Sequence, residues 1–537
     1  MAQKSYKLKD VESRFNDAVN TQADHRGEIL RHLDYYINSV FYQPKKGEKF
    51  SRNQVPVNLM ATFADKNIHF SSAFPEIKVL TNSGDPASRT KADLAEKLID
   101  SVLEKSLGKA MQRKLSQDGT LKSMAVLVTS FDFTKREVNV KRYDPRNVFF
   151  TRSNRNSDQI SELFIAYPVT VAEIREKYGI KGDIKEGAVE PFTYDESGDV
   201  NHLDNQDWRM MVIFMDDEVR GAFVGDRWIE KPHKHLMGTL PADIAIPLPD
   251  PREPLRGDFF IRTLVPLQAE INNAFKMRAG IVRKMGAPAI YARGLYSRQL
   301  EEVLRALQGD GGLIGLKGQG ELGVLAPPET KMIDNHIADL ITQMMRIAGF
   351  GSASFGEATG ANTSGDAYGM LFSPTTRSMD YQNIAWVALY QSVASKILYC
   401  YTRFYQDNEP IRLTGYRPLA TLMGNADDNA KTMPVFQQVN DELVFTKEAL
   451  MGVRNILVTM PSVTPVDKNA MDRLTYEMAT TGFISRTTGY ERIGIKSPED
   501  ELRLLQEENM NPAVNPEGAS KLISSMGGGQ NVQQPVQ

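Results

Sequence analysis

The segment RIAGFGSASFGEATGANTSGDAYGML, Arg346–Leu371, separates two runs of apolar residues that repeat at helical spacing. Its centre, residues 349–365, is built almost wholly of Gly, Ala, Ser and Thr, with two Phe, one Glu and one Asn. Compact domains rarely place about 15 small residues between two helices, and long loops of this kind usually carry a function. The segment therefore predicts a functional loop, and a connector without a role is the alternative.

The residues on either side of the loop predict two helices, over residues 331–348 and 366–405. One face of the first carries apolar side chains: Ile333, Ile337, Leu340, Ile341, Met344 and Ala348. Its opposite face carries polar side chains: His336, Asp339, Gln343 and Arg346.

A third helical pattern covers residues 264–286, with apolar positions at Leu264, Leu267, Ile271, Phe275, Val282 and Met285. At ~1.5 Å per residue this helix is roughly 30 Å long. A basic cluster lies near its end and consists of Lys276, Arg278, Arg283 and Lys284. Cations there stabilise the helix dipole and can also contact phosphate, so both interpretations stay open.

The insert between these two helices, residues 287–330, predicts a short helix over 297–309 and a glycine-rich hairpin over 313–329. The rest of the chain predicts an α+β protein. Helical patterns cover residues 7–45, 58–74, 86–115, 470–482 and 499–508. Strand patterns cover 75–80, 124–133, 136–150, 442–450 and 454–460, and residues 208–230 predict a hairpin. The last 25 residues or so are low in complexity, which predicts a flexible tail.

The composition of the 537 residues is that of a soluble globular protein, with a formal net charge of −3. This charge gives no general field for coating duplex DNA. The single cysteine, Cys400, cannot form a disulfide within the chain and fits a reducing compartment. The N-terminus has no apolar core of a secretory signal, and no run of ~18 apolar residues predicts a membrane span.

Candidate chemical motifs are weak. GQGELG (318–323) matches a dinucleotide fingerprint, but prolines follow where a helix should begin. His233 and His235 lie on one side of an extended segment without enough companions for a metal site. Asp216, Asp217 and Glu218 fit a solvated turn better than paired catalytic carboxylates. No Walker motif or nucleophile elbow is present, so the sequence predicts no enzyme, cofactor or metal.

The order of these features resembles that of the portal proteins of tailed bacteriophages. The strand that leads into Asp144, Pro145 and Val148 is similar to a segment of that family. The helix with Gln268 and Asn272 resembles the first portal stem helix, and the insert stands where the clip stands. The small-residue segment and the following Ser364, Gly365 and Ala367 resemble the tunnel loop and its helix. ISRTTGYERIGIKSPEDELRLLQEE (484–508) resembles the family's C-terminal pattern.

The resemblance implies a mainly helical portal fold with an α/β wing, a two-helix stem, a small α/β clip and a helical C-terminal crown. The implied divisions are 1–263 (wing, first part), 264–286 (stem helix 1), 287–330 (clip), 331–348 (stem helix 2), 349–365 (tunnel loop), 366–465 (wing, second part), 466–515 (crown) and 516–537 (flexible tail). The first ~130 residues and the tail depart from the family's pattern.

The resemblance also implies partners. The chain is expected to form a homo-oligomeric ring, usually of twelve subunits, at one capsid vertex. Double-stranded DNA passes through its channel during packaging and ejection, and the major capsid protein surrounds it. The terminase large subunit docks first, and head-completion or tail adaptor proteins follow. The expected location is the virion, after assembly in the host cytoplasm, and no membrane or catalysis is implied. Another virion structural or packaging protein, such as an adaptor, a capsid subunit or a terminase-like enzyme, is the alternative.

Site residues follow from these assignments. The tunnel loop is expected to meet DNA through Ser352, Phe355, Glu357, Asn362 and Thr363, with Phe355 packed between neighbouring loops and Glu357 forming an acidic ring. The clip is expected to dock partners through Arg298, Arg305, Lys317 and Glu321.

Overall fold

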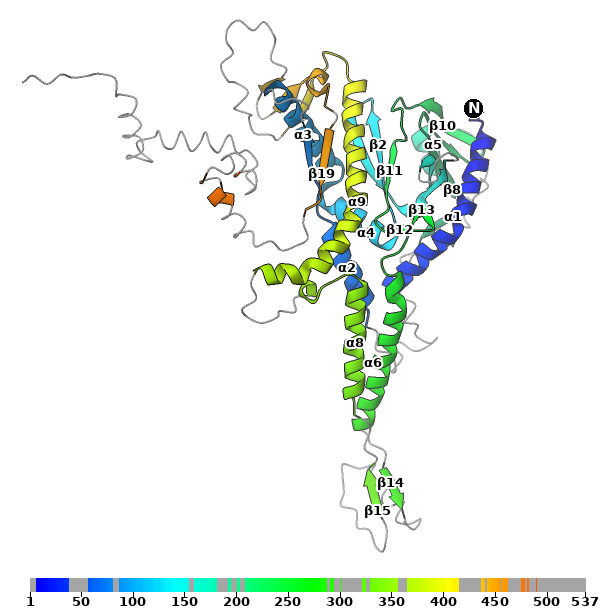
Figure 1. The fold of residues 1–537 in the computed structure, drawn as a ribbon. Coiled ribbons are helices and arrows are strands. Elements are labelled where there is room, and N and C mark those ends of the chain that lie inside the picture. The colour runs from blue at the N-terminus through cyan, green and yellow to red at the C-terminus, as the bar shows by residue number, and fades with distance from the viewer. Residues whose placement is uncertain are drawn as a thin grey trace, which may run out of the picture.

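The computed structural model consists of a mixed α and β body from which two antiparallel helices project, with a short pair of strands beyond their far end (Figure 1). The residues described are 6–37, 57–80, 86–153, 159–180, 192–194, 200–202, 208–286, 290–293, 301, 321–324, 329–355, 365–414, 436–439, 442–453, 455–461, 475–478, 481 and 489.

Apart from α5, which no pattern predicted, the helices lie close to the predicted positions. They are α1 (Leu8–Tyr36), α2 (Leu59–Ser71), α3 (Pro86–Ser106), α4 (Gly108–Leu121), α5 (Val171–Tyr178), α6 (Val265–Gly286), α8 (Lys331–Ile347) and α9 (Gly365–Phe404). Short 3-10 turns are η1 (Pro145–Asn147), η2 (Arg262–Leu264), η3 (Ser352–Phe355) and η5 (Lys447–Leu450). The predictions for 58–74, 264–286, 331–348 and 366–405 are therefore confirmed, whereas 499–508 lies outside the described residues.

The prediction of one helix over residues 86–115 is wrong. The chain forms two helices there, with α3 ending at Ser106, because Gly108 adopts a positive φ of 57° that breaks the helix. Glycine reaches this conformation without the steric cost that a side chain imposes. α4 then continues to Leu121, beyond the predicted end.

A five-stranded sheet of order β10-β9-β8-β5-β4 forms one half of the body. Its strands are β4 (Val148–Arg152), β5 (Ile160–Thr170), β8 (Trp208–Met215), β9 (Val219–Val224) and β10 (Arg227–Lys234). The predicted hairpin is β8–β9, but the sequence pattern missed β5, which pairs with β8. Alternate side chains divide between the sheet's faces: Phe149, Phe164 and Phe214 pack with Phe15 of α1, as the alternation of a strand requires.

The turn between β8 and β9 is only partly solvated, so the sequence interpretation is wrong for Asp216. Asp217 and Glu218 are exposed, but Asp216 is buried. Its carboxylate accepts hydrogen bonds from Tyr6 Oη at 2.8 Å and from the backbone N–H groups of Glu218 and Val219. The sequence could not reveal this role, because Tyr6 is 210 positions away.

A three-stranded sheet of order β11-β2-β3 lies between the larger sheet and the helices α3, α4 and α9. Its strands are β2 (Ala125–Asp132), β3 (Glu137–Tyr143) and β11 (Ala242–Ala245). The largest core cluster lies on its helical side and includes Trp386, Tyr390 and Leu98, all fully buried. α9 therefore forms the central helix of the body, as Figure 1 shows.

The remaining strands form small pairs or a second three-stranded sheet. They are β1 (Glu76–Leu80), β6 (Phe192–Tyr194), β7 (Val200–His202), β12 (Pro249–Asp250), β13 (Glu253–Gly257), β14 (Ile290–Arg293), β15 (Glu321–Val324), β16 (Ile411–Thr414), β17 (Phe436–Val439), β18 (Glu442–Phe445) and β19 (Asn455–Thr459). β1 pairs with β19, so the segments before and after the projecting helices form one body.

Candidate functional site

The projecting helices α6 and α8, called the stem pair below, pack most tightly at the body end. There Ile271, Leu340 and Met344 share a buried core. Toward the far end the apolar side chains become exposed, reaching 57% for Met277 and 83% for Met332. The stem pair therefore carries apolar surface that one copy of the chain leaves uncovered.

Gln268, in the first turn of α6, fixes α6 to the start of α2. Its buried side-chain oxygen accepts hydrogen bonds from the backbone N–H groups of Leu59 and Met60, at 2.9 and 3.1 Å. These N–H groups have no partner inside α2, because the first turn of a helix leaves them free. The sequence showed a polar residue in an apolar pattern, but not which element it caps.

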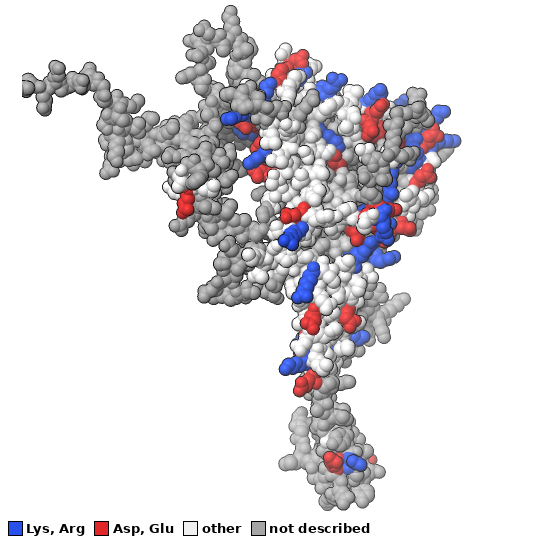
Figure 2. Space-filling model, in the orientation of Figure 1, with Lys and Arg blue, Asp and Glu red and all other residues white. Residues whose placement is uncertain are grey.

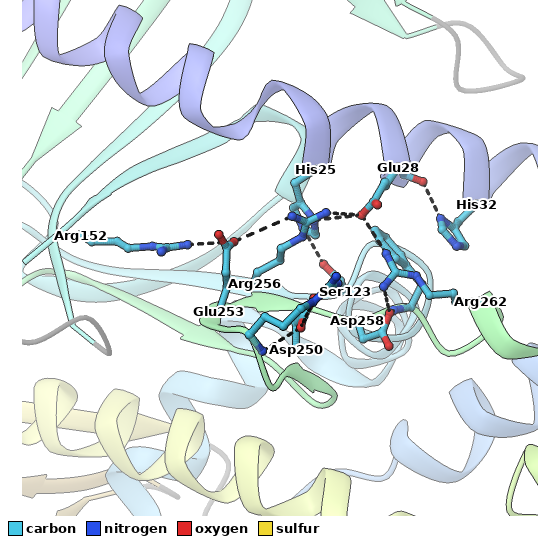
Figure 3. A network of polar contacts seen from close by, with 12 residues as sticks. His25, Glu28, His32, Ser123, Arg152, Asp250, Glu253, Arg256, Asp258 and Arg262 are labelled. Atoms are coloured by element: carbon cyan, nitrogen blue, oxygen red, sulfur yellow. Dashed lines mark hydrogen bonds and ion pairs between the residues drawn. The ribbon is translucent and has the colours of Figure 1, made fainter.

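A charged network joins α1 to the residues that lead into α6 (Figure 3). One carboxylate oxygen of Glu28 accepts from Arg256 at 2.6 Å and from Arg262 at 2.9 Å, and Arg262 also pairs with Asp258. His32 stacks on Phe259, with ring centroids 4.0 Å apart. This network was not predicted, because Glu28 and its two arginine partners are more than 220 residues apart in the sequence.

Burial and charge set the protonation states in this network. Burial and, to a lesser extent, the nearby charge of Arg256 lower the pKa of His25 to about 4. Burial raises the pKa of Glu28, but its hydrogen bond to Arg256 and the charges of both arginines outweigh that effect and lower the pKa overall. His25 is therefore neutral and Glu28 ionised at neutral pH.

The polar face predicted for the second stem helix is on the surface of the structure. His336, Asp339, Gln343 and Arg346 are all exposed, whereas Ile337, Leu340 and Met344 are buried. His336 lies 3.8 Å from Glu270 of α6, and Asp339 and Arg346 have no ion-pair partner among the described residues. Two opposite charges on this face are therefore available to a partner.

The basic cluster divides into residues with different surroundings. Lys276 is exposed. Arg278 instead pairs with Asp334 of α8 at 2.8 Å, so this guanidinium links the two stem helices. Arg283 and Lys284 belong to α6, but their side chains lie outside the described residues.

The first part of the small-residue segment is packed against the protein, which differs from the flexible loop predicted over 349–365. Gly349 has a φ of 76° and turns the chain after α8. The N–H of Gly351 donates to Thr375 Oγ1 at 3.1 Å, and Ser354 Oγ lies 2.7 Å from the same oxygen. Thr375 belongs to α9 and is fully buried, so α9 holds this part of the segment.

Phe355 also packs within its own chain, and its packing between neighbouring loops stays a prediction. Its ring centroid lies 5.1 Å from that of Phe63 and 6.0 Å from that of Phe350. Ser352 begins η3, but its side chain is not among those described. Glu357, Asn362 and Thr363 lie outside the described residues.

The far end of the stem pair carries β14 and β15, which pair in antiparallel register. Glu321 begins β15 opposite Arg293, and both are exposed. The second half of GQGELG is therefore a strand rather than the start of a helix, and the dinucleotide interpretation fails. Arg298, Arg305 and Lys317, and all of the predicted helix 297–309 except Glu301, lie outside the described residues.

The two histidines near β10 do not lie together at a metal site. His233 is exposed beside Glu230, whereas His235 bonds to the backbone oxygen of Asp216 at 2.9 Å. Among the described residues, no three His, Cys, Asp or Glu side chains are grouped so that they could hold a metal ion. No helix in the described part of the chain is long and apolar enough to cross a membrane.

Comparison with models of known protein families gives no match, and comparison with curated proteins gives none either. The function is therefore inferred from the geometry of the stem pair, its two ends and the segment that follows it.

Proposed function

We propose that this chain is the subunit of a portal ring, through which the double-stranded DNA of a tailed bacteriophage enters and leaves the capsid. The observation that carries the proposal is the arrangement of the stem pair. Two antiparallel helices project from an α/β body, carry a strand pair at the far end and lead into a packed turn and the long helix α9 (Figure 1). This is the order that the resemblance to portal proteins implies.

The uncovered apolar residues of the stem pair support a ring. A heterologous contact repeated by a closing rotation covers such residues on every copy. The proposed ring has about twelve copies, with the segment after α8 directed to its channel and the β14–β15 end directed to the terminase large subunit, and later to head-completion or tail adaptor proteins. The major capsid protein would surround the body.

Electron microscopy of the purified full chain tests this proposal. Closed rings with a central channel, without ATP hydrolysis by the chain alone, are the expected result. A stable monomer at micromolar concentration would overturn the proposal. Shells of many copies, or ATP hydrolysis by the chain, would favour another virion or packaging protein.

A further inference from the structure

Helix α9 lies over α2 and α4, and its contacts with them mark the side of α9 that faces into the protein. The side-chain amides of Gln382 and of Asn67 in α2 exchange hydrogen bonds at 3.0 and 3.2 Å. Trp386 packs on Gly119 of α4. The three helices therefore form two layers, with α9 on one side and α2 and α4 on the other.

The opposite side of α9 carries an exposed stripe, which consists of Arg377, Tyr381, Ile384 and Ala388. Ile384 is two positions from both Gln382 and Trp386, which places it about 160° around the helix from each of these contacts. Tyr381 and Ile384 are 56% and 68% exposed. Residues three or four apart share one face of a helix, so the stripe forms one line along α9. Figure 2 shows a broad, mostly uncharged surface over α9 and β19.

The outer sides of α2 and α4 form a second exposed surface, the α2–α4 face, which consists of Thr62, Asp65, Arg113 and Gln117. Asp65 is two positions from Asn67, and Gln117 is two positions from Gly119, so both point away from α9. The α9 stripe and the α2–α4 face therefore lie on opposite sides of one copy. A ring needs this arrangement, because each copy contacts its two neighbours through two different faces.

The directions of the helices show which residues of the two faces lie level with one another. Helix α4 runs antiparallel to α9, and α2 runs antiparallel to α4, as shown by the pairs Trp386–Gly119, Tyr390–Gln112, Asn67–Thr120 and Ser71–Ser116. Helix α2 is therefore parallel to α9. Gln382, Asn67 and Thr120 mark one common level, because Asn67 bonds to both of the others.

Arg377 and Asp65 lie on the same side of that level. At ~1.5 Å per residue they are about 7 Å and about 3 Å from it, toward the stem pair, whereas Ile384 and Gln117 are about 3 Å and about 5 Å from it in the other direction. Copies in a closed ring meet without a shift along its axis. Beyond its bend, α9 runs nearly parallel to the stem pair in Figure 1, and the stem pair lines the proposed channel. Arg377 of one copy therefore comes near the level of Asp65 on the next.

The charges at this level are complementary. Arg377 and Asp65 are both exposed, and Asp65 accepts a hydrogen bond from Tyr36 Oη at 2.7 Å. In the part of the chain that the structure describes, neither has an ion-pair partner. A stripe with a cation at one end thus fits a face with a carboxylate at the same level, and every copy of the chain supplies both.

We propose that the α9 stripe of one copy packs on the α2–α4 face of the next copy. Arg377 then pairs with Asp65, and the apolar part of the stripe loses contact with water. Ala388 comes level with Arg113 and leaves room for that long side chain. The proposal rests on the proposed ring, and it adds the two faces that close it.

Charge exchange tests this contact. Arg377→Glu and Asp65→Lys each bring like charges together at every copy-to-copy contact. Because an exposed ion pair contributes less than a tenfold change in affinity, we expect a rise of about fivefold in the protein concentration at which half of the chain is assembled. Light scattering and native mass spectrometry measure it. The double variant Arg377→Glu/Asp65→Lys should assemble near the wild-type concentration.

Mixing the two single variants separates contact between copies from contact within one copy. In an alternating ring the glutamate introduced at position 377 meets the lysine introduced at position 65 of the next copy, and the remaining contacts are those of wild type. The mixture should therefore assemble at a lower concentration than either variant alone. Arg403→Glu makes the same charge change at an exposed arginine of α9 outside the stripe, and it should assemble as wild type does.

Crosslinking gives a second measurement of the contact. Ile384 and Gln117 lie on opposite sides of one copy, about 20 Å or two helix diameters apart, so a short bismaleimide joins cysteines there only between copies. Cys400 is buried, and burial raises the pKa of its thiol to about 12, so it does not compete. Ile384→Cys/Gln117→Cys should give a ladder of linked chains, whereas Ile384→Cys alone should not.

The outcomes distinguish this contact from the ring itself. Equal assembly of wild type and both single variants would overturn the pairing of Arg377 with Asp65, and rings without the ladder would overturn the contact between the two faces. Both results leave the proposed function standing. Folded single variants that neither the exchange nor the mixture rescues would overturn the contact too. Absence of rings in the wild type would overturn the proposed function.

Discussion

Single side chains connect the stem pair to the body over long distances in the sequence. Gln268 caps α2, and Glu28 joins α1 to Arg256 and Arg262. Each of these groups is wholly or partly buried. Removing one partner of a buried polar contact lowers the free energy of unfolding by about 1–3 kcal/mol, because the other partner is left with neither a hydrogen bond nor water. The direction of the stem pair is therefore determined by a few polar contacts as well as by apolar packing.

Stability should fall with acid because of His25. Its pKa drops from 6.5 in the unfolded chain to about 4 in the folded protein, so folding favours the neutral form. The contribution of neutral His25 to the free energy of unfolding is therefore complete above pH 6.5. It is lost as the pH falls toward 4. At about 1.4 kcal/mol per pKa unit, the free energy of unfolding should decrease by about 1 kcal/mol between pH 7.5 and 5.5.

Thermal unfolding of the His25→Gln variant over this pH range measures the effect. The variant should show a weaker pH dependence than wild type, and His69→Gln, at an exposed histidine, is the control. An unchanged slope in His25→Gln would contradict the assignment to His25.

Phe355→Ala should destabilise the turn after α8. Phe355 is partly buried against Phe63 and Phe350, so we expect a loss of about 2 kcal/mol, below the range for a fully buried ring. Limited proteolysis between residues 349 and 365 should become faster. Phe133→Ala, at a ring that is 59% exposed, is the matched control and should change little. Equal cleavage rates in wild type and Phe355→Ala would show that this ring does not hold the turn.

At the scale of elements, the segment after α8 has a packed part and a part that the structure leaves undescribed. Residues 349–355 are tied to α9 through Thr375, whereas residues 356–364 join them to its beginning. α9 also contains Pro374, and Figure 1 shows the helix bent toward its N-terminal end. Proline removes one backbone hydrogen bond and clashes with the preceding turn, which accounts for the bend.

Replacement of residues 356–363 by a shorter Gly-Ser linker should leave ring assembly intact, because the packed turn and the stem pair remain. In the proposed channel the linker is expected to cause incomplete packaging or leakage of DNA. The measurement is the yield of full, infectious heads. The same replacement over residues 313–320, in the segment expected to be the clip, is the comparison and should instead affect partner docking. If the replacement of residues 356–363 gives wild-type yields, these residues only connect the packed turn to α9.

For the whole molecule, the proposed ring would repeat, once per copy, any cation that faces its channel. Lys276 is exposed, and each phosphate contact contributes about −0.9 to the slope of log K against log salt concentration. Lys276→Ala should therefore make DNA binding by assembled rings weaker and less dependent on salt. Arg278→Ala should mainly loosen the stem pair, because Arg278 pairs with Asp334.

Titration of duplex DNA with preformed rings at several salt concentrations checks this difference. If Lys276→Ala and wild type give the same slope, Lys276 does not contact phosphate, and the cluster only stabilises the end of α6.

The sequence alone determined the elements whose residues are near one another along the chain. The 3.6-residue repeat of α8 predicted both its buried face and its exposed charges. Two apolar runs on either side of the acidic residues 216–218 predicted the hairpin of β8 and β9. A prediction from the local sequence fails where a residue packs against a distant part of the chain. The burial of Asp216 under Tyr6 and the packing of Phe355 on Phe63 depend on such neighbours, whereas the break at Gly108 is a local effect that the helical pattern missed.

Only the tertiary structure decided how the candidate site is held together. β1 pairs with β19 across about 380 residues, and Glu28 reaches Arg262 across 234. A hydrophobic repeat shows that a residue is buried, but many distant segments could supply the partner, and only the fold selects one. For that reason the stem pair could be predicted as two helices, whereas its anchoring to α1, α2 and α9 could not.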